Sequence, residues 1–183
     1  MNDEAKTPEE GGRLADGSAP ATPEALFARL EALGIAQRST SHPAVFTVEE
    51  SKALCGTLPG VHIKNLFLRN KKGAMWLLTC QEDREIDLKD LGARLGAGRL
   101  SFGSAERLMR HLGVIPGAVT PFAVVNDRAG LVAVVLDRAL LTAETVNGHP
   151  LVNTMTTALS GADLVRFLEA EGHPPQILDM DPG

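Results

Sequence analysis

The chain has 183 residues, of which 44% are hydrophobic, and this suits one globular domain with a sizeable core. The formal net charge of −5 argues against a protein that coats nucleic acid non-specifically. No apolar run approaches the roughly 18 residues of a membrane helix, so we expect no membrane partner and a cytoplasmic location.

The first 21 residues are polar, acidic and rich in Gly, Ala and Pro. Neither a signal peptide nor an Arg-rich transit peptide has this composition. We therefore expect residues 1–21 to form a disordered extension and residues 22–180 to form the single domain.

The first predicted element is a helix that begins at Thr22 and Pro23 and ends at Gly34. An extended segment over 41–46 follows, because a proline disfavours the α conformation in the residue before it. Thr47 and Glu50 have capping-box spacing and predict a short helix over 47–54. Apolar runs at 62–70 and 74–80, joined by Lys-Lys-Gly, predict a β-hairpin.

The second half of the chain continues the mixture of short helices and strands. Asp87 and Ser104 are N-cap candidates for two helices, and Ser160 and Asp163 have capping-box-like spacing at the start of a third. The predicted elements are helices over 87–97, 104–113 and 160–172, strands at 99–102 and 175–180, a Gly/Pro loop over 113–122, a hairpin over 122–137 with its turn at 126–130, and two extended pieces around a turn at 147–150.

This order predicts an α+β fold, a single domain with a curved, mostly antiparallel mixed β-sheet that is barrel-like and flanked by short helices. The chain has no regular βαβ repeat and no GxGxxG or P-loop signature. Those absences argue against a doubly wound nucleotide-binding sheet.

Motifs for metal and nucleophilic chemistry are also missing. Cys55 and Cys80 lie outside any CxxC spacing, and the five histidines show no HxxxH or HxH spacing. No serine lies in a GxSxG elbow. We expect no metal and no cofactor, and we interpret Cys80 as a buried thiol.

The hairpin over 62–80 carries two polar residues, Lys64 and Asn65, within an apolar run. Lys64 shares a strand face with two leucines. Its ammonium either extends to solvent from the sheet edge or lies at the mouth of a pocket that takes an anionic ligand. Asn65 either closes a turn or orients a substrate, and the pattern alone leaves both pairs of alternatives open.

Two further segments have a structural and a functional interpretation. In the Gly/Pro loop, Gly113 is a candidate helix cap, and Pro116 and Gly117 are turn residues. The loop is either a tight connector or a source of backbone N–H groups for an oxyanion. His149, which precedes a proline, is either a surface turn residue or a rigidly placed functional ring.

Three segments taken together resemble a known family. "HIKNLFLRNKKGAMWLLTC", the loop "GVIPGAVTPF" and the tail "NGHPLVNTMTTALSGADLVRFLEAEGHPP" are similar to the bacterial prolyl-tRNA-editing domain family, the YbaK-type aminoacyl-tRNA deacylases. The similarity covers roughly residues 23–180 and is greatest to the free-standing alanyl-tRNA(Pro) deacylases.

This resemblance implies a trans-editing hydrolase that removes alanine from mischarged tRNA(Pro) without a metal or a protein nucleophile. It implies that Lys64 anchors the terminal adenosine and that Asn65, Gly113, Pro116, Gly117 and His149 bind the substrate. Water would attack the ester, helped by the ribose 2′-hydroxyl and by the Gly/Pro loop. The implied partners are aminoacyl-tRNA(Pro) and, transiently, prolyl-tRNA synthetase or an elongation factor.

The charge is unevenly distributed along the chain. Residues 60–110 hold ten Lys/Arg and six Asp/Glu, a balance of +4, and the remainder holds eight and 17, a balance of −9. Four of the basic residues are candidates for contacts with the tRNA backbone: Arg69, Lys71, Lys72 and Arg84. Mixed charge on solvated helix faces is the alternative interpretation.

Two other functions remain open at this point. One is a deacylase for a different mischarged tRNA, such as a cysteinyl or seryl ester. The other is a non-catalytic module that binds tRNA or a synthetase.

Overall fold

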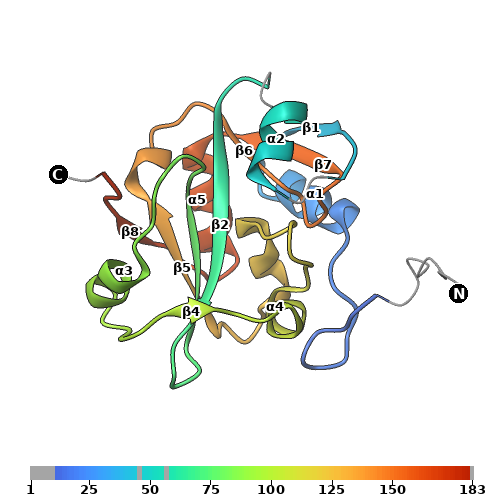
Figure 1. Cartoon of the computed structure of the whole chain (residues 1–183). Coiled ribbons are helices and arrows are strands. Elements are labelled where there is room, and N and C mark those ends of the chain that lie inside the picture. The colour runs from blue at the N-terminus through green and yellow to red at the C-terminus, as the bar shows by residue number, and fades with distance from the viewer. Residues whose placement is uncertain (1–10, 45–46, 56–57, 182–183) are drawn as a thin grey trace, which may run out of the picture.

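The computed structural model describes residues 11–44, 47–55 and 58–181. Its secondary structure agrees with most of the predicted elements (Figure 1). The helices are α1 (Pro23–Ala32), α2 (Val48–Cys55), α3 (Leu88–Arg94), α4 (Ala105–Leu112) and α5 (Gly161–Ala170), with short 3₁₀ helices η1 (Pro121–Asn126) and η2 (Arg138–Leu140). The strands are β1 (Arg38–Ser41), β2 (Val61–Arg69), β3 (Met75–Gln81), β4 (Ser101–Phe102), β5 (Val132–Asp137), β6 (Val146–Gly148), β7 (Met155–Leu159) and β8 (Gln176–Leu178).

The predicted helix caps are confirmed. The side chains of Thr22, Asp87, Ser104 and Ser160 each accept hydrogen bonds from backbone N–H groups in the first turn of the helix that follows. These bonds satisfy donors that a helix N-terminus leaves unpaired. At the other end of α4, Gly113 adopts a left-handed conformation with φ of 66° and closes the helix.

The strands form one mixed sheet in the order β1-β7-β6-β2-β3-β5-β8, with β4 paired to β2. Among the described strands, four pairings are antiparallel and three are parallel. The sheet ends at β1 on one side and β8 on the other, so it is an open sheet and not a closed barrel. The α+β prediction with a mixed sheet is confirmed.

Two hydrophobic clusters cover the two faces of the sheet. The larger contains α1, α4, α5 and η1 packed against one face, with Phe122 and Phe167 in edge-to-face contact. The smaller packs Leu91 of α3 against Leu68 of β2 and Leu78 of β3 on the opposite face. Alternate residues of β2 therefore point into different clusters.

The predicted hairpin over 122–137 is wrong in its first half. Residues Pro121–Asn126 form η1, and only Val132–Asp137 is a strand, which pairs in parallel with β3 and β8. Thr120 caps η1 and Pro121 occupies its first turn, where a missing N–H does no harm. The apolar run resembles a strand because Phe122, Ala123 and Val124 are all buried, and a short buried run has no period that distinguishes a strand from a helix.

Two other predictions differ from the structure. The extended segment lies at Arg38–Ser41, before the predicted 41–46, of which residues 45–46 lie outside the described residues. The described part of the N-terminal extension, residues 11–21, packs on α4: Leu14 is buried, and the Ala15 N–H donates to the Arg110 carbonyl. Residues 1–10 lie outside the described residues.

Candidate functional site

Strand β2 is shared between two parts of the sheet, and a small cavity opens where those parts separate. Val61 and His62 pair with β6, whereas Ile63–Arg69 pair with β3. The cavity at this fork measures about 20 Å³, which is room for about one water molecule. Its walls are His62, Ile63, Asn65, Asn147, Gly148, His149 and Thr156. The structure thus brings together Asn65 and His149, which lie far apart in the sequence.

Asn65 fixes the Gly/Pro loop against the sheet beside this cavity. Its side-chain Nδ2 donates to the Val119 carbonyl at 3.0 Å, and its Oδ1 accepts from the Thr79 hydroxyl at 2.6 Å. Thr79 is fully buried on the neighbouring strand β3. The amide of Asn65 is therefore used twice within the fold, and its position is set by partners on both sides.

The other predicted loop residues do not line the cavity. Gly113 caps α4 and lies against Pro20 and Asn126, where a Cβ would come within 3 Å of both side chains. Pro116 and Gly117 form a turn closed by the Ala118 N–H to the Ile115 carbonyl at 3.0 Å. Gly117 has φ of 91°, which the third residue of a type II turn requires. These residues shape the loop, and Asn65 connects the loop to the cavity.

His149 presents one free ring nitrogen in the cavity wall. Its Nδ1 lies 2.9 Å from the Met155 carbonyl, which can only accept, so Nδ1 carries the proton. Burial lowers the pKa of His149, with a smaller contribution from His42, whose ring centroid is 6.2 Å away. The ring is consequently neutral near pH 7, and its Nε2 is left as a hydrogen-bond acceptor.

Lys64 lies next to the fork but its ammonium points away from the cavity. It shares a face of β2 with His62, while Asn65 faces the larger hydrophobic cluster. Its Nζ donates to the backbone carbonyl of Arg84. An ammonium has three N–H donors, so two remain for a ligand.

Arg84 is part of an internal ion-pair network. Its Nε lies 3.1 Å from the buried Asp137 carboxylate, and its Nη1 pairs with Asp181. The guanidinium is mostly covered, with 17% of the side chain exposed. Arg84 therefore holds in place the carbonyl that receives Lys64, and its side chain is occupied within the protein.

The three other predicted tRNA contacts lie at the far end of β2. Arg69 is its last residue, and Lys71 and Lys72 are exposed in the turn to β3. Arg69 is five residues beyond Lys64 on β2, which corresponds to about 17 Å, and the turn with Lys71 and Lys72 follows it. None of these three side chains forms an ion pair with another described residue.

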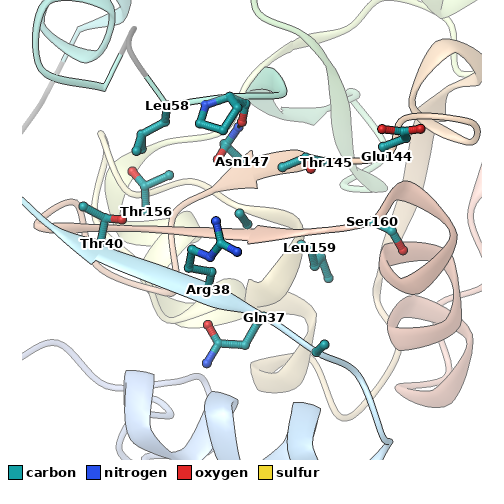
Figure 2. Close-up of a pocket in the computed structure, with 13 residues that line it drawn as sticks. Gln37, Arg38, Thr40, Leu58, Glu144, Thr145, Asn147, Thr156, Leu159 and Ser160 are labelled. Atoms are coloured by element: carbon teal, nitrogen blue, oxygen red, sulfur yellow. The ribbon is translucent and has the colours of Figure 1, made fainter.

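A wider pocket of about 290 Å³ adjoins the cavity across the face of β1, β7 and β6 (Figure 2). Asn147 and Thr156 line both spaces. The pairings place Arg38 opposite Ala158, Ala158 opposite Asn147, and Asn147 opposite His62, in one row across four strands. We call the sheet face that bears this row the polar face; Lys64 lies on it, two residues beyond His62.

Sequence reasoning missed His62, Asn147, Thr156 and Arg38. A two-residue period from Lys64 would have pointed to His62, but the others reach the site through pairings between distant segments. Among the described residues, no group of three His, Cys, Asp or Glu side chains is placed to hold a metal ion. No helix within the described ranges is long and apolar enough to cross a membrane.

Comparison with known proteins gives consistent matches. The model of the aminoacyl-tRNA editing domain family matches residues 42–167. "Prolyl-tRNA synthetase associated domain-containing protein 1" of Mus musculus is 42% identical over 161 residues, covering 85% of this chain and 95% of the mouse protein. "Prolyl-tRNA editing protein ProX" of Acetoanaerobium sticklandii is 36% identical over 158 residues, covering 86% of this chain and 96% of that protein.

The fold is also similar to solved structures. A crystal structure described as a candidate trans-editing enzyme for prolyl tRNA synthetase superposes with a TM-score of 0.68 at 22% identity. The match covers 91% of this chain and all of the other. At that identity the similarity concerns the fold alone.

Proposed function

Since the chain belongs to the aminoacyl-tRNA editing domain family, we propose that it is a trans-acting deacylase that hydrolyses mischarged alanyl-tRNA(Pro). The family is not confined to bacteria, because relatives at similar identity come from a mouse and from a bacterium. The observation that carries the proposal is the small fork cavity between Asn65 and His149, which joins a wider, open pocket.

The size of the cavity supports alanine as the amino acid removed. A space of about 20 Å³ suits a methyl group and excludes a pyrrolidine ring without movement of its walls. A synthetase pocket built for proline discriminates poorly against a smaller side chain, since a missing methylene is worth only about 1–3 kcal/mol. A second, smaller site that rejects proline by size supplies the remaining selectivity.

The proposed roles follow from the positions of the side chains. The neutral Nε2 of His149 accepts a hydrogen bond from the α-ammonium of the alanyl group. Lys64 uses its remaining donors to hold the phosphate of the terminal adenosine and so places the ester at the fork. Water attacks the ester carbonyl, assisted by the ribose 2′-hydroxyl and by backbone groups of the loop that Asn65 anchors. No metal is assigned a role.

The basic residues at the far end of β2 fit a longer contact with the tRNA. Arg69 lies about 17 Å from Lys64 along β2, just before the turn that carries Lys71 and Lys72, and about five stacked nucleotides span that distance at ~3.4 Å each. We assign these three residues to backbone phosphates of the acceptor stem. Arg84 is assigned to the support of Lys64 because its own charge is paired within the protein.

The experiment that tests this function compares esters of different size on the same tRNA. Glycyl-, alanyl-, seryl-, cysteinyl- and prolyl-tRNA(Pro) are incubated with excess protein, and loss of each amino acid is followed. The proposal expects alanine to be released fastest and proline to be retained. Faster release of cysteine or serine would show that the preferred substrate is a different ester, and release of proline would contradict selection by cavity size.

Protonation of His149 is expected to switch the activity off at acid pH. Because the pKa of His149 is lowered, the acid limb of the rate profile should have its midpoint below 6.5, the ordinary value. The variant His149→Gln should lose about tenfold in rate and lose that limb. His111→Gln is the matched control, because burial also lowers the pKa of His111 but it lies in α4, away from the cavity. An unchanged limb in His149→Gln would contradict the assignment.

A further inference from the structure

The pocket around Arg38 contains a charged side chain that the fold does not use. Arg38 lies on β1, and its guanidinium extends into the pocket (Figure 2). It makes no hydrogen bond or ion pair with any described residue. An exposed arginine is ordinary on a protein surface, but this one lies in a concave site next to the proposed reaction centre.

The walls of the pocket are chemically mixed. Apolar groups come from Leu58, Pro59, Ala158 and Leu159, and amide groups come from Gln37 and Asn147. Among the lining residues that the structure describes, Arg38 is the one cation and Glu144 the one carboxylate, at the end of the pocket near Ser160 (Figure 2). A carboxylate in the same space disfavours a phosphate there, whereas a neutral planar group with donors and acceptors at its edge suits all of these walls.

The position of the pocket identifies which part of the substrate reaches it. The terminal ribose of an aminoacyl-tRNA carries three groups: the amino acid ester, the 5′-phosphate and the base. Three matching features lie around the fork, namely the small cavity, Lys64 on β2, and the pocket beyond Asn147 and Thr156. Arg38 and His62 lie three strand spacings apart, about 14 Å, which leaves room for a ribose between them.

We propose that this pocket binds the purine base of the 3′-terminal adenosine, with the Arg38 guanidinium stacked on the ring. Guanidinium planes stack on unstacked RNA bases in this way. Asn147 already donates its Nδ2 to the Pro59 and Val61 carbonyls, and the Gln37 Oε1 accepts from the Ser39 hydroxyl. The Gln37 Nε2 therefore remains as a donor for N7 of adenine, and the Asn147 Oδ1 as an acceptor for its N6 amino group. The volume of about 290 Å³ is at the lower end for ligand sites, roughly 300–1,000 Å³, and therefore accommodates one nucleoside.

This inference rests on the proposed function for its choice of ligand, and binding of a free nucleoside tests it separately. Adenosine, cytidine and ribose 5-phosphate are titrated against the protein by NMR. Adenosine is expected to bind about tenfold more tightly than cytidine, and Arg38→Ala should remove most of that preference. Because the contact is with a neutral ring, added salt should change adenosine binding little.

The kinetic counterpart uses alanyl-tRNA(Pro) in single turnover. Arg38→Ala should raise the protein concentration needed for half-maximal rate about tenfold and leave the maximal rate nearly unchanged. Arg128→Ala is the matched control, since Arg128 is also exposed but lies in the turn before β5, at the opposite end of the sheet. Arg38 is exposed, so its replacement should leave the fold intact.

The outcomes separate the two proposals. If the wild type binds adenosine through Arg38 but hydrolyses no aminoacyl ester, the result supports the base site and contradicts the deacylase function. If the wild type hydrolyses the alanyl ester and Arg38→Ala has the same adenosine affinity and the same kinetics, the result contradicts the base site and supports the deacylase function. Loss of ribose 5-phosphate binding in Arg38→Ala, with adenosine binding retained, would overturn the base site in favour of a phosphate contact.

Discussion

Replacing Lys64 by alanine is expected to lower the single-turnover rate of alanyl-tRNA(Pro) hydrolysis by about 100-fold or more. Lys64 is the cation of the polar face that lies beside the fork, and two of its three donors are available to a ligand. Without it the terminal phosphate has no counter-charge and the ester is no longer held over the cavity. A misplacement of about 1 Å is enough to reduce a rate by this order.

The same change should leave the protein folded. Among the described residues, the Lys64 side chain makes one hydrogen bond, to the Arg84 carbonyl, and both residues are half-buried. We therefore expect a loss of about 1 kcal/mol in unfolding free energy. Lys64→Arg keeps the charge with a different donor geometry and should recover part of the rate. Lys89→Ala, on exposed α3, is the control for loss of one lysine. Full activity in Lys64→Ala would show that Lys64 has no part in the reaction.

Asp127→Asn is expected to give the largest loss of stability, about 3 kcal/mol. Asp127 is 4% exposed and accepts from His173 Nε2 at 2.9 Å and from the amides of Leu131 and Val132. The Nδ1 of His173 faces the Glu171 carbonyl, so both ring nitrogens donate and the ring is an imidazolium. This buried pair joins the turn before β5 to the end of α5.

The pair also sets a pH window for its contribution to stability. Burial alone would raise the pKa of Asp127, but the hydrogen bonds from His173, Val132 and Leu131 lower it below 3.8. The carboxylate therefore contributes to stability above pH 3.8, and this contribution is lost as the pH falls through the pKa of Asp127 in the folded protein. The hydrogen bond to Asp127 raises the pKa of His173 above 6.5. The contribution of the imidazolium to stability is therefore complete below pH 6.5 and is lost as the pH rises through the pKa of His173 in the folded protein. The contribution is therefore greatest between about pH 4 and 6.5.

Urea unfolding at pH 5.5 and pH 9 measures this effect. The difference in unfolding free energy between the wild type and Asp127→Asn should be larger at pH 5.5 than at pH 9. Asp163→Asn is the control, because Asp163 pairs with Arg166 on the surface of α5, where an ion pair contributes about 0–1 kcal/mol. Equal differences at the two pH values would mean that the imidazolium adds nothing to the pair.

Much of the fold could be predicted because its signals are local. The caps at Thr22, Asp87, Ser104 and Ser160 each depend on a side chain and an amide two or three residues later. The hairpin of β2 and β3 is likewise local. The strand predicted within Pro121–Asn126 was wrong because Phe122, Ala123 and Val124 are buried in succession and so show no period of two. The partners of β5, which are β3 and β8, depend on long-range parallel pairing.

The candidate site could be predicted only in part, for the same reason. Lys64 and Asn65 were conspicuous within one apolar run, and His149 stood next to a proline. That Asn65 and His149 share a cavity depends on the pairing of β2 with β6, about 85 residues later in the chain. Arg38 had no local feature that set it apart from a surface arginine, and its pocket exists because β1 pairs with β7.

The central claim, that this protein hydrolyses alanyl-tRNA(Pro), is tested most directly by one measurement. Alanyl-tRNA(Pro) and prolyl-tRNA(Pro) are each mixed with excess protein at pH 7.5, and the remaining ester is measured over time. We predict rapid loss of alanine and survival of prolyl-tRNA(Pro) at its uncatalysed rate. Survival of both esters at the uncatalysed rate would contradict the claim and would leave either a different aminoacyl ester as the substrate or a module that binds tRNA without catalysis.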